Sequence, residues 1–467
     1  MKPRNYKNKK KLKSIVTEYE AMFEQGTVCF FEETVFLDIA DYYENKNMID
    51  EALNAISHAI EQNSFSAALL IRKAELLLIK NCIPTAMDYL DKAELFFPND
   101  QTIKIMKIEV MVEQGHLSKS LILIKEMEED MDRRYTARLF YLKSLVYEAK
   151  RNYGKMFRSL NKAVMVDPDN ELILKKLWLG VELTGKFEES VDIHNMVIDH
   201  NPFSATAWYN LGHAHLKLEE YCEAEEAFEY AFLIEEDFED AYRDCAEVRI
   251  RMKDYEGALD CYEEMLTLFN PDSALFVNIG YCYECMDKYD LAQVCYEKSF
   301  KYSRENDWAY FRKGSCLLKT GKTEQAIIFL EKANLMEKNS EVYINELAKA
   351  YCRNGEDKKA NDLYYKATGA APDLCSVWIN YVKFLLAKGK VKGALELIEE
   401  AEIYAMGVEL VYCKAACLIV ADKRTKGNLV LRQALRQKYD THYCLFSIYP
   451  QLKDDVDVLL EISTFQL

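Results

Sequence analysis

Alanine recurs every 34 residues through the second half of this sequence. Six alanines keep this spacing without an insertion or deletion, at positions 224, 258, 292, 326, 360 and 394. An aromatic or branched aliphatic residue follows each of them four positions later, at Phe228, Tyr262, Tyr296, Leu330, Tyr364 and Ile398. Residues four apart share one face of a helix, so each pair indicates the buried side of a helix. A period of this length predicts a stack of helical units instead of one globular core.

The clearest unit runs from Ala205 to Phe238 and contains two amphipathic patterns. A first helix is predicted by residues at i, i+3, i+4 and i+7, namely Trp208, Leu211, Gly212 and His215. A second helix is predicted by Ala224, Phe228 and Ala231. The polar segment LEEY between them predicts a turn that brings the second helix back antiparallel to the first.

This pattern resembles the tetratricopeptide repeat, a 34-residue helix-turn-helix with tryptophan, leucine–glycine, tyrosine, alanine, phenylalanine, alanine and proline at these offsets. The resemblance implies an all-α fold, a right-handed superhelical α-solenoid of tandem helix-turn-helix repeats. We predict twelve repeats over residues 33–440, with starts at 33, 67, 101, 137, 171, 205, 239, 273, 307, 341, 375 and 409. Residues 1–13 are predicted to form a basic flexible tail, 14–32 an N-terminal capping helix and linker, and 441–467 a partial repeat and C-terminal capping helix.

Two places depart from the regular pattern. The third and fourth repeats start 36 residues apart, and we place the extra pair in a lengthened turn around Asp132 to Tyr135. In the fifth repeat Trp178 occupies the position where the resembled family prefers a small residue, and Gly180 follows two places later. The first helix of that repeat is therefore expected to be rotated or displaced.

Charge and composition limit the classes of partner and location. The net charge is −17 although the first thirteen residues hold seven basic side chains and no acidic one, so the remaining chain is strongly acidic. Such a surface repels phosphate backbones, which argues against a nucleic-acid partner. No uncharged apolar run is long enough to cross a bilayer, and Glu18, Glu20 and Glu24 interrupt any signal-peptide core. With 14 cysteines spread through the predicted helices, we expect a soluble cytoplasmic protein without membrane insertion.

No motif predicts catalysis, and the sequence indicates no cofactor, metal or small-molecule substrate. The GKT at 321–323 lacks the preceding glycine of a phosphate-binding loop and falls in a turn between helices. Cys282 and Cys285 form a CxxC motif, but no second pair accompanies it at zinc spacing, so helix packing is the favoured interpretation. The sequence therefore predicts a binding module that is not an enzyme.

In the resembled family, the first helices line a concave groove that binds peptides. The corresponding candidate residues here are Tyr209, Asn210, His213, Arg243, Asn278, Tyr281, Trp308, Phe311, Arg312, Lys349, Arg353, Asn380 and Lys383. Three asparagines, Asn210, Asn278 and Asn380, occupy the position that holds a peptide backbone in family members, although solvated side chains are an equal alternative. The family's carboxylate clamp is not reproduced.

The charges along this predicted groove are asymmetric. The first three repeats supply mainly acids, whereas the last four supply Arg312, Lys319, Lys349, Arg353, Lys383 and Lys414, with Glu346 the main exception. We therefore expect a bound segment to place its acidic end over repeats nine to twelve. The leading hypothesis is a protein-interaction scaffold that binds a protein segment in its groove. The alternative is an accessory or regulatory subunit that acts through its ends or convex surface.

Overall fold

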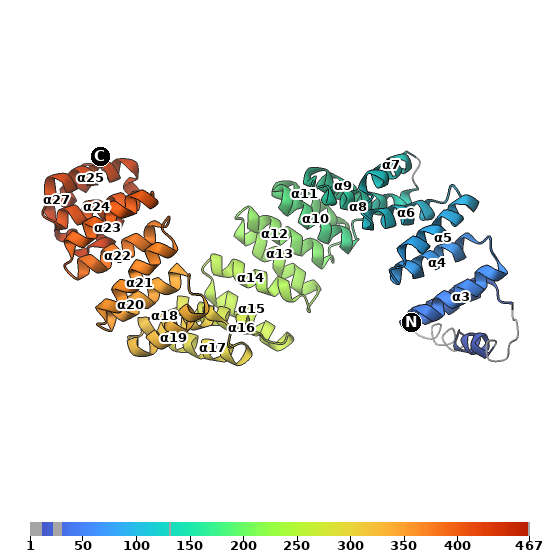
Figure 1. Cartoon of the computed structure of the whole chain (residues 1–467), viewed down its shortest axis with the longest axis horizontal. Coiled ribbons are helices and arrows are strands. Elements are labelled where there is room, and N and C mark those ends of the chain that lie inside the picture. The colour runs from blue at the N-terminus through green and yellow to red at the C-terminus, as the bar shows by residue number, and fades with distance from the viewer. Residues whose placement is uncertain (1–11, 22–29, 130–131, 466–467) are drawn as a thin grey trace. The chain divides into compact units, whose positions relative to one another are not determined.

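The computed structural model describes residues 12–21, 30–129 and 132–465, and every regular element in these ranges is a helix (Figure 1). The chain divides into two compact units, Met1–Ala241 and Tyr242–Leu467. None of the helices within the described ranges combines the length and apolarity needed to span a membrane.

The first unit is a series of helical hairpins. Residues 12–21 are helical, and the helices that follow are α2 (Glu33–Glu44), α3 (Ile49–Gln62), α4 (Ala67–Ile79), α5 (Ile83–Phe96), α6 (Gln101–Glu113), α7 (Leu117–Glu128), α8 (Arg133–Ala149), α9 (Tyr153–Val166), α10 (Glu171–Thr184), α11 (Phe187–His200), α12 (Ala205–Lys217) and α13 (Tyr221–Ile234). Even-numbered helices are the first helices of the hairpins, and odd-numbered helices are the second.

The second unit continues the same alternation. Its helices are α14 (Glu239–Arg251), which begins at the division between the units, α15 (Tyr255–Leu268), α16 (Ser273–Cys285), α17 (Tyr289–Tyr302), α18 (Asp307–Lys319), α19 (Thr323–Met336), α20 (Glu341–Arg353), α21 (Asp357–Ala370), α22 (Cys375–Ala387), α23 (Val391–Tyr404), α24 (Val408–Val420), α25 (Arg424–Gln437), α26 (Tyr443–Ile448) and α27 (Val456–Ser463). The all-α tandem architecture predicted from the period is confirmed, and α2 to α25 agree with about twelve repeats.

The 34-residue alanines lie where the two helices of a hairpin cross. All six, from Ala224 to Ala394, are completely buried. The facing glycines explain how close the helices come. A Cβ atom on Gly280 would lie 2.6 Å from Tyr296, and one on Gly314 would lie 2.6 Å from Leu330. A larger residue at either position would force the two helices apart.

Each turn from a first to a second helix passes through one residue with left-handed backbone. The residues are Asn47, Asn81, Gly115, Arg151, Gly185, Glu219, Lys253, Asp287, Gly321, Gly355, Gly389 and Asp422, with φ between 54° and 82°. This conformation reverses the chain after the first helix and suits glycine or asparagine. The left-handed backbone conformation at this turn position therefore recurs in every repeat, although the residue type varies.

The prediction of a lengthened turn around Asp132 to Tyr135 is wrong for these residues, which the structure describes. Helix α8 begins at Arg133 and has 17 residues, against 13 for most first helices. Asp132 caps it by accepting a hydrogen bond from the backbone amide of Arg134 at 3.0 Å. The additional residues therefore lengthen a capped helix. Residues 130–131 lie outside the described ranges.

Short helices pack against both ends of the hairpin series. Val16 and Tyr19 are buried against the core of the first hairpin. At the other end, Val458 and Ile462 of α27 are buried, and Arg432 forms an ion pair with Glu461 at 2.6 Å. Residues 1–11 of the predicted basic tail and residues 22–29 of the predicted capping helix and linker lie outside the described residues.

Candidate functional site

The predicted groove residues are divided between the two units of the chain. Tyr209, Asn210 and His213 belong to α12 in the first unit. The second unit holds the others: Arg243 on α14, Asn278 and Tyr281 on α16, Trp308, Phe311 and Arg312 on α18, Lys349 and Arg353 on α20, and Asn380 and Lys383 on α22. Neighbouring first helices from α16 to α24 contact one another, so most of the second set shares one surface (Figure 1). We call it the first-helix face.

An aromatic cluster forms the centre of this face. Trp308 is 44% exposed and stacks on Phe311, with ring centroids 5.1 Å apart. Phe311 stacks in turn on Tyr343 at 4.8 Å, and the Tyr343 hydroxyl donates to Asp307 at 2.7 Å. The Arg312 guanidinium lies 4.5 Å from the centre of the Tyr281 ring. A rigid, partly exposed aromatic beside an arginine is the type of residue pair that anchors protein interfaces. Tyr343 is not among the groove residues predicted from the sequence.

A buried carboxylate lies directly beneath this cluster. Glu284 is 5% exposed and pairs with both Arg312 and Lys319, each at 3.0 Å. It also accepts a hydrogen bond from the Tyr296 hydroxyl at 3.0 Å. Burial alone would lower the pKa of Arg312, but the charge of Glu284 raises it. Arg312 and Lys319 therefore neutralise an internal acid, which reduces the positive charge predicted for this part of the face.

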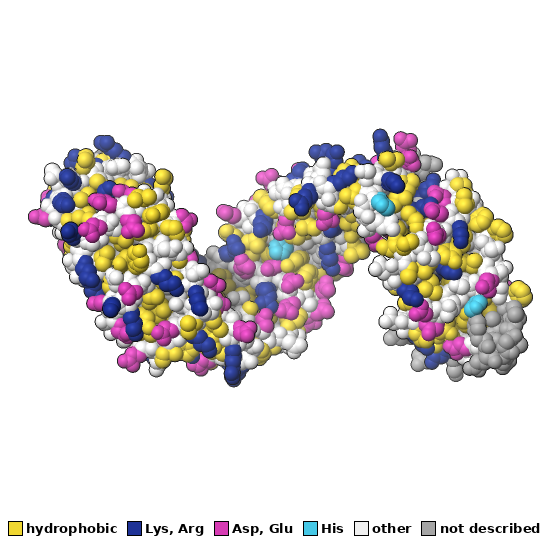
Figure 2. Space-filling model, in the orientation of Figure 1, with side chains coloured by type: hydrophobic (Ala, Val, Ile, Leu, Met, Phe, Trp, Pro, Cys, Tyr) yellow, Lys and Arg dark blue, Asp and Glu magenta, His cyan; other side chains and the backbone are white. Residues whose placement is uncertain are grey.

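Other predicted cations also have partners within the chain. Lys349 pairs with Glu346 at 2.9 Å, and Lys414 pairs with Glu402 at 2.7 Å. Arg353 donates to the Leu318 carbonyl oxygen at 2.9 Å. On the visible face of each unit, acidic and basic side chains are interspersed (Figure 2). The simple positive end that we predicted is therefore largely neutralised by local pairing.

Lys383 differs from the other predicted cations. It is half-buried on α22 and has no hydrogen bond or ion pair with any residue in the described part of the chain. Burial lowers the pKa of Lys383, and the nearby positive charge of Lys349 lowers it further. A half-buried ammonium without a counter-charge is unfavourable until an anion reaches it.

The three asparagines do not share one environment. Asn210 is only 2% exposed, and its amide donates to the Leu174 carbonyl oxygen at 3.1 Å. This bond joins α12 to α10, so the structure gives Asn210 a packing role in place of the expected peptide contact. Asn278 and Asn380 are half-buried and form no hydrogen bond with another side chain or backbone group in the described ranges. They keep both amide donors and an acceptor available.

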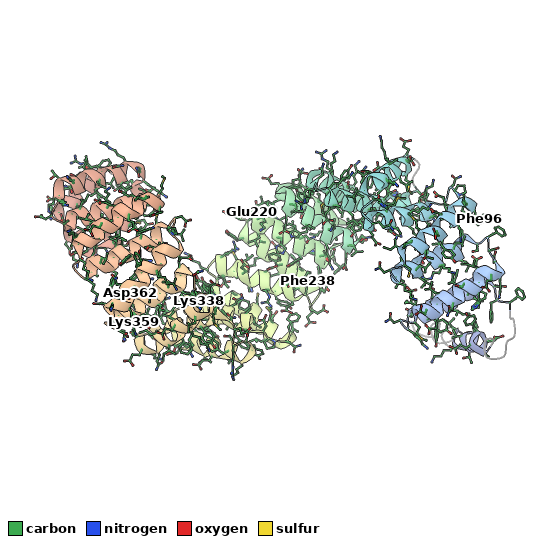
Figure 3. The ribbon with its side chains drawn as sticks, viewed as in Figure 1. Phe96, Glu220, Phe238, Lys338, Lys359 and Asp362 are labelled. Atoms are coloured by element: carbon green, nitrogen blue, oxygen red, sulfur yellow. The ribbon has the colours of Figure 1, made fainter. Side chains whose placement is uncertain are left out.

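The first unit carries a separate aromatic cluster. The Trp178 ring stacks on His213 with centroids 5.2 Å apart, and Tyr209 contacts His213 edge-on at 4.5 Å. Tyr209 also packs against Phe238 at 4.7 Å, a residue labelled in Figure 3. Trp178 is half-buried and also packs against the core of the first unit, and a Cβ on Gly180 would be 3.6 Å from the backbone of Phe157. This is an ordinary van der Waals distance, longer than the 2.6–2.7 Å found at Gly212, Gly280 and Gly314, and the expected rotation or displacement of α10 stays a prediction.

The remaining candidates have ordinary structural partners. Arg243 lies 4.0 Å from Asp272. Cys282 is completely buried, and this burial raises the pKa of its thiol to about 12. No cluster of His, Cys, Asp or Glu within the described ranges has the arrangement needed to hold a metal ion. The geometry around these residues is that of helix packing.

Comparison with known proteins places these features in context. The model of the tetratricopeptide repeat family matches residues 137–170, 205–238, 273–306 and 309–340. RNA polymerase II-associated protein 3 of Xenopus tropicalis is 26% identical over 105 residues, which are 22% of this chain and 16% of that protein. The Xenopus laevis protein of the same name is 26% identical over 106 residues, 23% of this chain and 16% of its own length. The matched region thus spans less than a fifth of these relatives.

Solved structures give similar but distant matches. YrrB, described as a TPR protein with an unusual peptide-binding site, is 19% identical with a TM-score of 0.34, over 42% of this chain and 97% of its own. Cut9–Hcn1, an APC/C hetero-tetramer, is 13% identical with a TM-score of 0.41, over 90% and 98% of the two chains. Yeast Tom70 is 14% identical with a TM-score of 0.40, over 95% and 96%.

Proposed function

Because the chain is a tetratricopeptide repeat protein, we propose that it is a non-catalytic scaffold that binds a segment of a partner protein on its first-helix face. The observation that carries the proposal is Lys383, a half-buried cation without a counter-charge among the described residues. A carboxylate on the partner would supply that charge and form a charge-assisted hydrogen bond. The fold itself supports an interaction role, and the specific surface is our inference.

The aromatic cluster supplies the second part of the proposed site. Trp308 offers an exposed ring whose position is held by Phe311, and Arg312 is fixed by Glu284. An apolar side chain of the partner would pack on Trp308, since preorganised aromatic anchors contribute much of the binding energy in interfaces. On α22, one helical turn before Lys383, the amide of Asn380 would pair with the backbone of the segment. The bound segment is therefore extended, with an apolar residue near α18 and an acidic residue near α22.

The test compares retention of partners by charge variants of the full chain. Lys383→Glu replaces the unpaired cation, and Lys392→Glu is the matched control because the Lys392 side chain is 93% exposed on α23. Proteins captured from the native extract by wild type are quantified for both variants and for Trp308→Ala. We expect a partner that Lys383→Glu and Trp308→Ala lose and Lys392→Glu retains. Equal capture by all variants would refute binding on this face and favour the terminal helices or the outer surface.

We also propose a cytoplasmic location and no nucleic-acid partner. The net charge of −17 supports the second point, because like charges repel a phosphate backbone. The first is supported by buried thiols such as Cys282, Cys413 and Cys417, which pack as small apolar side chains. Fractionation of the native cell, followed by measurement of nucleic acid in the purified protein, checks both.

A further inference from the structure

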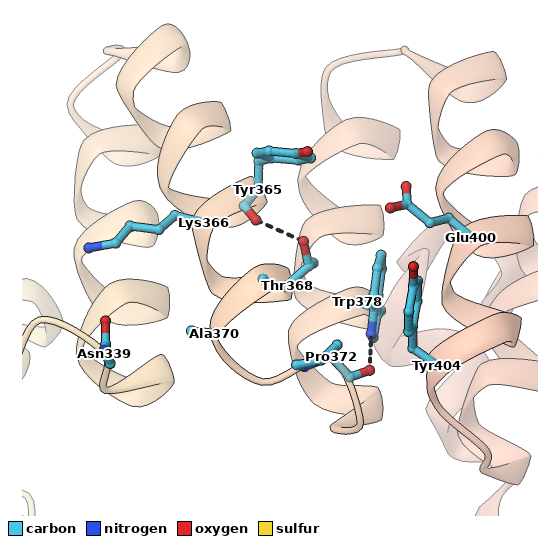
Figure 4. A pocket seen from close by; sticks show the side chains of 10 residues that line it. Asn339, Tyr365, Lys366, Thr368, Ala370, Pro372, Trp378, Glu400 and Tyr404 are labelled. Atoms are coloured by element: carbon cyan, nitrogen blue, oxygen red, sulfur yellow. Dashed lines mark hydrogen bonds between the residues drawn. The ribbon is translucent and has the colours of Figure 1, made fainter.

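A pocket of about 540 Å³ lies among α21, α22 and α23, apart from the residues of the first-helix face (Figure 4). Its lining includes Tyr365, Trp378, Glu400 and Tyr404, with Asn339 from the turn that precedes α20. This volume is within the range of about 300–1,000 Å³ that is typical of ligand pockets. The pocket belongs entirely to the second unit.

Aromatic rings form the walls of this pocket, and one of them is rigidly held. Trp378 is 2% exposed, and its indole N–H donates to the Pro372 carbonyl oxygen at 2.8 Å. The ring lies parallel to Tyr404, with an angle of 2° and centroids 6.2 Å apart. Tyr404 and Tyr365 remain 56% and 65% exposed. The two tyrosines therefore offer ring surface to a ligand, and Tyr404 does so while stacked on the fixed Trp378.

The charged groups of the pocket are separated. The Glu400 carboxylate faces the space between the Tyr365 ring and the Trp378–Tyr404 pair (Figure 4). It forms no ion pair with another residue in the described ranges. Lys366 extends away from Glu400, and its ammonium donates to the Lys338 carbonyl oxygen at 3.0 Å. The end of the pocket near the tyrosines thus carries an uncompensated negative charge.

We propose that this pocket binds an arginine side chain of a partner protein. The guanidinium would pair with Glu400 and stack on the exposed faces of Tyr365 and Tyr404. A carboxylate beside aromatic faces attracts a cation through both its charge and the ring quadrupoles. A planar guanidinium can stack and donate to the carboxylate together, whereas a lysine ammonium is compact and more strongly hydrated. The net charge of −17 also favours the approach of basic partners.

This second site selects a charge opposite to that expected at Lys383. A partner segment with an acidic residue would occupy the first-helix face, and an arginine-bearing segment would occupy the pocket. Both sites draw on α22, which carries Trp378 and Lys383, but their charged groups lie on different helices, with Lys383 on α22 and Glu400 on α23. Each site can therefore be removed without the other.

The experiment uses the full chain labelled with ¹⁵N-tryptophan and follows the indole signals by NMR. The chain has 4 tryptophans, and Trp378→Phe identifies the signal in the pocket. The probes are the capped tripeptides Ac-Gly-Arg-Gly-NH₂, Ac-Gly-Lys-Gly-NH₂ and Ac-Gly-Gln-Gly-NH₂. We expect the arginine peptide to shift the Trp378 signal with saturation, the lysine peptide to bind more weakly, and the glutamine peptide to cause no saturating shift.

Two matched variants test whether the Glu400 carboxylate binds the arginine peptide. Glu400→Gln should weaken the arginine peptide about fivefold, the effect of one partly exposed ion pair. Glu399→Gln changes a neighbouring exposed acid that does not line the pocket, and it should leave the affinity unchanged. Unchanged signals of the other tryptophans verify folding. Equal binding of the arginine and glutamine peptides, or equal affinity of the two variants, would overturn the proposal. Lys383→Glu should not affect this titration, so its result is independent of the proposed scaffold site.

Discussion

Replacement of Gly280 by alanine tests the helix crossing on which the whole repeat depends. Gly280 lies on α16, and an added Cβ would come within 2.6 Å of Cε1 and 2.9 Å of Cδ1 of Tyr296. Tyr296 is completely buried, and its hydroxyl donates to the buried Glu284 carboxylate at 3.0 Å. The methyl group must therefore separate α16 from α17 or move the ring away from Glu284.

The size of the effect follows from three contributions. Overpacking costs about 1–3 kcal/mol, and the loss of the tyrosine hydrogen bond costs about 1 kcal/mol. The better helix propensity of alanine returns about 1 kcal/mol. We therefore expect Gly280→Ala to lower the free energy of unfolding by about 1–3 kcal/mol.

Thermal unfolding followed by circular dichroism measures this change, and hydrogen exchange locates it. For a unit of this size, 1 kcal/mol corresponds to a shift of about 2–4 °C in Tm. Amides of α16 and α17 should exchange faster in the variant. The matched control is Gly369→Ala on α21, where an added Cβ meets no atom within 4 Å. That variant should be as stable as wild type or up to about 1 kcal/mol more stable.

Equal midpoints for the two variants would refute the reasoning. Such a result would mean that Gly280 does not approach Tyr296 closely, and that the register between α16 and α17 differs from the one described.

Three further predictions concern stability. Ala292→Leu places a larger side chain at a completely buried crossing and should cost about 1–3 kcal/mol, so an unmoved thermal midpoint would contradict the assigned register. Lys253→Gly removes a side chain from a backbone with φ of 65° and should stabilise the protein by about 1 kcal/mol; a lower midpoint in denaturant would contradict this. His194 is completely buried, and burial lowers its pKa to about 4, below the ordinary value of 6.5. In the unfolded protein the His194 imidazole binds a proton more readily than in the folded protein. The free energy of unfolding present above pH 6.5 should therefore fall by about 3 kcal/mol as the pH falls to 4. His194→Leu should lack this fall in stability between pH 6.5 and 4. Parallel profiles of unfolding free energy against pH for wild type and variant would contradict the role of His194.

Much of the fold was predictable from the sequence because each repeat packs mainly on its neighbours. The spacing of Ala224, Ala258 and Ala292 identified the second helices, and all three are completely buried as expected. Glycines stand at the same repeat position at 212, 280 and 314, and a Cβ at each would meet the facing side chain at 2.6–2.7 Å. These contacts join residues close in sequence, so a repeated pattern contains most of the necessary information.

The candidate site was less predictable because side-chain partners depend on the distances between helices. Asn210 and Asn278 occupy the same position of the repeat, so the same role was expected for both. Asn210 is nevertheless buried and donates a hydrogen bond to the Leu174 carbonyl oxygen. The same reasoning counted Arg312 as a free positive charge, although Glu284 binds it from the preceding hairpin. A pair of opposite charges at facing positions of adjacent repeats was the available signal, but its geometry required the structure.

The sequence by itself therefore determined the helical period, the buried positions and the repeat family. Only the tertiary structure revealed the left-handed turn residues Arg151, Glu219 and Lys253, because none of them is a glycine or asparagine that would favour this conformation. It also distinguished the unpaired Lys383 from its paired neighbours and brought Tyr365, Trp378 and Glu400 around one pocket. The physical reason is that apolar burial follows local periodicity, whereas the pairing of a charge depends on the distance and orientation of groups on separate helices.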